Sequence, residues 1–141
     1  MFFFLKFKTS FAIVLFFFLV SCAGTGSKIK PSISQQSDNY SNLYFVRQGG
    51  YVAGGILAKI DVNGMEIAKL GTKEYISFKT AKNFKIKVSG AGISGLGMGS
   101  DSTSGVSNGK NYFYIIGVKQ GLFSAKFTIN ETTESGYNQA L

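Results

Sequence analysis

Apolar and polar residues alternate with a period of two along most of the chain beyond residue 42. Successive side chains of a strand point to opposite faces of a sheet, so this alternation predicts half-buried β-strands. Before the C-terminal tail, no window shows the 3.6-residue period of an amphipathic helix. The expected strands are 43–47, 58–62, 65–69, 75–79, 84–88, 112–118 and 122–129.

Two of these strands are separated only by Asn63 and Gly64. Asn-Gly between alternating runs is a strong hairpin signal, because a type I′ turn needs a positive φ at both positions. The run 112–118 is apolar on both faces, which is typical of a central strand. About seven short strands in roughly 90 residues predict an all-β fold: a small antiparallel β-sandwich of immunoglobulin-like type.

The N-terminus has a different pattern. Lys6 and Lys8 precede ten uninterrupted apolar residues, 11–20. This length is typical of a secretory signal and is too short for a membrane span, which needs about 20 apolar residues. The interpretation is a signal peptide over residues 1–21, and the alternative is an uncleaved N-terminal anchor.

The apolar run ends in a motif that contains the only cysteine of the chain. The motif is Leu19-Val20-Ser21-Cys22, and it resembles the lipobox of bacterial lipoproteins. The resemblance implies that the Cys22 thiol receives a diacylglycerol, that the signal is cut before it, and that the new amine is acylated. Two or three acyl chains give an effectively permanent anchor. Ala23 resembles the sorting pattern of Gram-negative lipoproteins that reach the outer membrane and face the periplasm.

The sequence therefore divides into four parts. Residues 1–21 form the lipoprotein signal peptide. Residues 22–41 hold the lipidated cysteine and a flexible linker, since this stretch is small, polar and without periodicity. Residues 42–130 form the β-sandwich, and residues 131–141 form a C-terminal tail in which a short helix fits.

The strand motifs resemble a known family. They read YFVR, IDVNGMEIAKL, YISF, FKIKVSG and GKNYFYIIGV, and they span about residues 42–130. They resemble the bacterial lipoprotein family called domain of unknown function 2846. The chain departs from it at residues 80–83, where the family usually carries a Pro-Gly-Lys-His turn. The resemblance implies a β-sandwich in the cell envelope and implies no activity.

Composition excludes several kinds of chemistry. The 141 residues contain no histidine and one cysteine, which excludes histidine-dependent catalysis and a thiolate or imidazole zinc site. The seven acidic residues give no paired-carboxylate arrangement of the kind that acid–base catalysis needs. We expect no enzyme, no cofactor and no metal site.

The charge balance bears on partners. The formal net charge of +8 falls to +6 when Lys6 and Lys8 leave with residues 1–21. A basic excess favours anionic surroundings such as lipid headgroups or acidic glycans. The alternative is that lysines spread singly along strands form an ordinary solvated face. Export argues against nucleic acid, so the expected partners are the membrane, through Cys22, and another envelope protein or an anionic glycan.

Residues 90–109 hold seven glycines. Gly90 to Gly95 fit the G-x-G-x-x-G pattern, but the sequence that follows cannot form the helix that a dinucleotide site requires. The first half of the segment is apolar, with Ile93, Leu96 and Met98. Long loops are usually functional or disordered, so two readings stay open. The segment enters a membrane or contacts a partner, or it is disordered or packs on itself.

Arg47 is the only arginine. Its guanidinium either binds an anionic ligand bidentately or forms a structural salt bridge with Asp61 or Glu66. The candidate partner-binding residues are therefore Arg47, Ile93, Leu96 and Met98. The expected function is that of a lipid-anchored envelope lipoprotein whose sandwich is a non-catalytic interaction module of unknown partner. The alternative is a structural envelope lipoprotein that acts through its anchor and basic surface.

Overall fold

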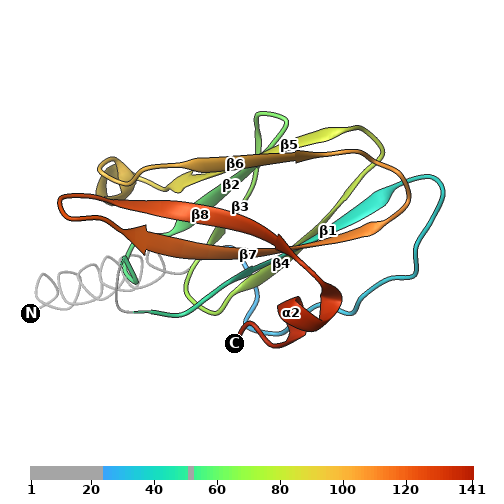
Figure 1. Ribbon diagram of the computed structural model, residues 1–141, viewed down its shortest axis with the longest axis horizontal. Helices are drawn as coiled ribbons and strands as arrows, with labels where there is room; N and C mark the ends of the chain where they lie inside the picture. Colours follow the sequence, from blue (N-terminus) through green and yellow to red (C-terminus); the bar gives the residue numbers. More distant parts are fainter. Residues whose placement is uncertain (1–23, 51–52) are drawn as a thin grey trace, which may run out of the picture.

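The structure, a computed structural model that describes residues 24–50 and 53–141, is a sandwich of two four-stranded sheets (Figure 1). The first sheet contains, in spatial order, β4 (Tyr75–Thr80), β1 (Ser41–Arg47), β7 (Asn111–Gln120) and β8 (Ala125–Thr132). The second contains β3 (Met65–Leu70), β2 (Ala58–Val62), β5 (Phe84–Gly90) and β6 (Asp101–Gly105). The expected all-β sandwich is confirmed, with eight strands in the described residues rather than about seven.

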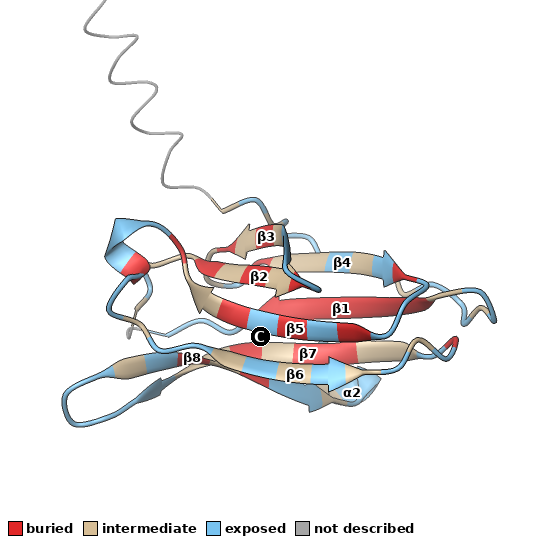
Figure 2. Ribbon diagram, turned by 90° about the horizontal axis from the view of Figure 1, so that it is seen from above, coloured by how far each residue is buried: buried red, intermediate tan, exposed pale blue. Residues whose placement is uncertain are grey.

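The core lies between the sheets and follows the alternation in the sequence. Along β5, Phe84, Ile86 and Val88 are buried while the lysines between them are exposed. These side chains meet apolar residues of the opposite sheet, such as Phe45 and Ile116. Figure 2 shows the same alternation of buried and exposed positions along the ribbon of β5.

The first sheet is also covered on its outer face. β1 is buried along its whole length, and Tyr44 stacks on Phe113 of β7 with ring centroids 5.2 Å apart. Tyr137 closes this second cluster from the helix α2 (Glu134–Asn138). The helix begins after Thr133, whose hydroxyl accepts a hydrogen bond from the Gly136 amide. β1 and β7 run parallel, whereas the other pairs of named strands are antiparallel.

The hairpin between β2 and β3 forms where the sequence predicts it. Asn63 has a φ of 51° and Gly64 a φ of 81°, as a type I′ turn requires. The Asn63 carboxamide also accepts a hydrogen bond from the Lys85 amide and donates one to the Asn83 carbonyl. The turn is thereby fixed to β5.

Gly64→Val is expected to lower the free energy of unfolding by at least about 1 kcal/mol, because a β-branched residue is disfavoured at positive φ. The matched control is Gly97→Val, at an exposed glycine with open space around its α-carbon. Urea unfolding of both variants measures the difference. Equal midpoints for Gly64→Val and the wild type would contradict the role of the turn.

The glycine-rich segment 90–109 is not the long loop expected from its composition. It contains a 3-10 helix, η1 (Ile93–Gly95), and the edge strand β6, which pairs antiparallel with β5. Gly90 and Gly95 come so close that a β-carbon on Gly95 would lie 2.3 Å from the Gly90 carbonyl carbon. The two glycines thus permit a backbone contact that folds the segment back on itself.

The described part of the expected flexible linker is attached to the domain. The Thr25 amide donates to the Lys69 carbonyl at 2.8 Å, and Ser27 bridges Tyr75 of β4. The Ser34 amide donates to the Tyr44 hydroxyl at 2.8 Å. The expectation of a free linker is therefore wrong from residue 24 onward, because hydrogen bonds at Thr25, Ser27 and Ser34 hold this segment on the sandwich. Among the helices of the described residues, none has the length and hydropathy of a membrane span.

Candidate functional site

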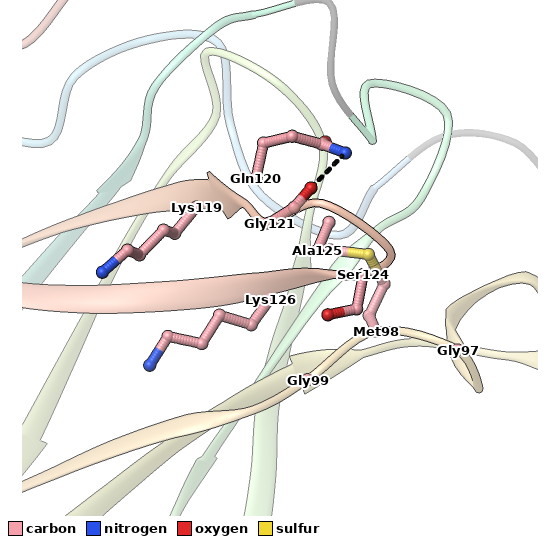
Figure 3. A pocket seen from close by; sticks show the side chains of 9 residues that line it. All are labelled: Gly97, Met98, Gly99, Lys119, Gln120, Gly121, Ser124, Ala125 and Lys126. Carbon is pink, nitrogen blue, oxygen red and sulfur yellow. Dashed lines mark hydrogen bonds between the residues drawn. The ribbon is translucent and has the colours of Figure 1, made fainter.

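A groove of about 540 Å³ separates the glycine-rich segment from the hairpin of β7 and β8 (Figure 3). The Gly99 amide donates to the Ala125 carbonyl at 2.9 Å, and the Gly99 carbonyl accepts from the Phe127 amide at 3.0 Å. These two hydrogen bonds connect the glycine-rich segment to β8 along one side of the groove. The lining residues are Gly97, Met98, Gly99, Lys119, Gln120, Gly121, Ser124, Ala125 and Lys126.

Two lysines face each other across the hairpin. Lys119 and Lys126 are directly opposite in the register of β7 and β8, and Figure 3 shows that their side chains extend on the same side of it. Like charges directly opposite each other in a sheet destabilise the pair. The two ammonium groups therefore repel each other, and an anionic group bound beside them would reduce this repulsion.

The candidate apolar residues of the glycine-rich segment separate into two kinds. Ile93 and Leu96 are exposed around η1, whereas Met98 is half-buried, lines the groove and packs against the main core. The structure adds two exposed residues that sequence reasoning missed, Leu122 and Phe123. The sequence pattern predicts a strand that begins at residue 122, but β8 begins at residue 125.

Leu122 and Phe123 form the tip of the turn between β7 and β8. The Gly121 amide donates to the Ser124 carbonyl at 2.7 Å and closes the turn on both sides of them. Gly121 and Ser124, both common in turns, are the available sequence signal. An apolar pair beside Ala125 and Phe127 is otherwise indistinguishable from the start of a strand.

Arg47 lies inside the sandwich, where the backbone takes up its guanidinium. Its side chain is 1% exposed, and its guanidinium donates to the carbonyls of Leu70 and Ala53 at 2.8 Å and also to Ile56. The ring of Phe127 lies 5.0 Å from its guanidinium carbon. Both interpretations of Arg47 are therefore wrong. Its guanidinium is buried and does not face an external anion. In the described residues it forms no ion pair, because Asp61 pairs with Lys59 and Glu66 pairs with Lys69.

Three buried groups in the described residues have shifted pKa values. Burial lowers the pKa of Arg47, and the charge of Glu74 opposes this shift. Burial raises the pKa of Tyr114 and of Tyr137, whose hydroxyls have no hydrogen-bond partner in the described residues. These groups lie within packed clusters, so they contribute to the fold and not to the surface of the groove.

The lipobox residues Leu19, Val20, Ser21 and Cys22 lie outside the described residues. The structure places the chain from Gly24 onward, two positions after Cys22. Comparison of the chain with models of protein families, with curated proteins and with solved structures finds no significant match.

Proposed function

We propose that this chain is an exported lipoprotein, anchored by acyl groups on Cys22, whose sandwich is a non-catalytic binding module of a bacterial envelope. The observation that carries the proposal is the position of the only cysteine, which completes the motif Leu19-Val20-Ser21-Cys22 directly after ten apolar residues. The resemblance to the domain of unknown function 2846 family adds the same envelope location. Ala23 favours the outer membrane, facing the periplasm.

Features of the folded domain support a binding role over a catalytic one. The chain has no histidine, and its only arginine is occupied by backbone carbonyls. The exposed groups around the groove are lysines, an amide, a hydroxyl and apolar side chains. Such groups bind anionic or apolar partners.

Metabolic labelling of cells with a palmitate analogue tests the anchor. The wild type is expected to be labelled and Cys22→Ser to lose essentially all label, because no other thiol exists. The matched control is Ser21→Ala, which keeps the lipobox pattern and is expected to keep the label. Equal labelling of wild type and Cys22→Ser would contradict the proposal.

Crosslinking in intact cells separates the interaction module from a purely structural lipoprotein. A specific protein partner that stays bound in high salt supports the module. A partner that is held only by exposed charges is released in high salt, because the Debye length falls to about 3 Å at 1 M salt and the charges no longer attract each other strongly. Loss of every crosslinked partner in high salt would favour the structural alternative.

A further inference from the structure

Segments far apart in sequence meet at one end of the sandwich. Ala58 pairs with Leu70 of β3 and with Gly90 of β5, so β3 ends where the glycine-rich segment begins. Gly99 then joins this segment to β8. Figures 1 and 2 both show η1 and the turn between β7 and β8 at the same end of the molecule, on the left. We call this the η1 end.

The η1 end carries large apolar side chains that are almost fully in water. The exposed fractions are 89% for Ile93, 82% for Leu96, 93% for Leu122 and 98% for Phe123. None of the four is needed to fill the core. The four lie on two loops of this one end, and exposed apolar patches mark sites of contact with a protein or a membrane.

The same end is positively charged. Lys119 and Lys126 flank the turn that holds Leu122 and Phe123, and neither takes part in the ion pairs found in the described residues. The carboxylates nearby are occupied by the backbone. Glu74 is buried and accepts from the Gly71 amide, whereas Asp101 accepts from the amides of β6 and β8.

The described chain starts at this end. Thr25 makes two hydrogen bonds of 2.8 Å with Lys69, next to the last residue of β3. Cys22 precedes Gly24 by two residues, and two residues span about 7 Å at most. An acyl group on Cys22 therefore holds the η1 end, and not the opposite end, at the bilayer surface.

We infer that the η1 end docks on an anionic phospholipid bilayer, an inference that rests on the proposed acyl anchor at Cys22. Ile93, Leu96, Leu122 and Phe123 enter the boundary between headgroups and acyl chains, and Lys119 and Lys126 contact lipid phosphates. Apolar groups beside basic ones bind membrane surfaces in this way, with apolar burial and electrostatic attraction adding together. The attachment at Thr25 and Lys69 gives the domain one orientation on the membrane.

An environment-sensitive dye on a single introduced thiol tests the docking. The mature acylated protein, which begins at Cys22 and carries Leu122→Cys, is labelled and reconstituted into vesicles of phosphatidylcholine with phosphatidylglycerol. The matched control is Lys82→Cys, in the exposed turn between β4 and β5 at the opposite end. The dye at 122 is expected to shift to the blue and to be quenched by lipids spin-labelled near the headgroup. The dye at 82 is expected to do neither.

Charge variants test the role of the lysines. Lys119→Gln with Lys126→Gln, in the Leu122→Cys protein, is expected to lower the ratio of docked to undocked protein on anionic vesicles by roughly five-fold for each lysine. Replacement of Lys85 and Lys87, which are exposed on β5, by glutamine is expected to change the ratio of docked to undocked protein little. Equal effects of the two pairs would contradict the assignment of Lys119 and Lys126.

The outcomes separate the docking from the anchor. If the dye at 122 stays in water at low salt although the protein still floats with vesicles at high salt, the docking is overturned and the anchor is intact. Protein that no longer floats with vesicles overturns the anchor and, with it, the docking. A dye at 122 that is shielded in cells but not on vesicles identifies a protein as the occupant and contradicts the lipid assignment.

Discussion

Arg47→Met is expected to lower the free energy of unfolding by about 3 kcal/mol. The guanidinium donates to three backbone carbonyls, two of them in the loop between β1 and β2, and hydrogen bonds from a charged donor contribute roughly 1.5–3 kcal/mol each. Removing the buried charge recovers part of this energy, because burial of a charge is costly. Methionine fills a similar volume, so the loss reports the hydrogen bonds more than a cavity.

Thermal unfolding measures this effect, and the melting temperature is expected to fall by more than about 10 °C. Lys85→Met is the matched control, since it removes the same charge from an exposed position on a strand and is expected to change the melting temperature little. If the two variants melted at the same temperature, Arg47 would not be the residue that holds the β1–β2 loop on the domain.

Gly95→Val is expected to cost about 2 kcal/mol, within the range for side chains forced into a packed site. A β-carbon there would overlap the Gly90 backbone, which is not a flexible side chain that can move away. The segment around η1 must then shift, and Ile93 and Leu96 move with it. We therefore expect weaker docking of the η1 end as well as lower stability.

Gly97→Val, two residues along the same segment, is the control, because a β-carbon on Gly97 has open space. Chemical denaturation compares the two variants, and hydrogen exchange at the Ala91 amide, which bonds the Leu57 carbonyl, reports local opening. Unchanged stability and exchange in Gly95→Val would show that the Gly90–Gly95 contact is dispensable.

The strands that sequence reasoning located are those with strong side-chain alternation. Asn63 and Gly64 fix a hairpin by local conformation alone, and β5 repeats an apolar residue at every second position. β6 was missed because its sequence, DSTSG, holds no large apolar residue. Its place in the sheet comes from backbone pairing with β5, which leaves no side-chain pattern to detect.

The wrong predictions at the candidate site also arise because the contacts that decide them join residues far apart in the sequence. A lone arginine suggests a surface charge, and only the folded loop reveals the carbonyls that make its burial possible. The polar residues of the expected linker suggest a free chain, yet backbone hydrogen bonds attach Thr25 to β3 and Ser27 to β4, and the Ser34 amide bonds the Tyr44 hydroxyl. The composition of the glycine-rich segment singles out Ile93 and Leu96. Leu122 and Phe123, which also lie at the η1 end, have a sequence pattern that is typical of a strand.

The intact mass of the protein extracted from membranes in detergent tests the lipid anchor most directly. The account predicts a chain that begins at Cys22 and is heavier than residues 22–141 alone by a diacylglyceryl group, with or without a further acyl chain on its amine. A chain that still begins at Met1, or one cleaved before Cys22 without added lipid, would contradict it.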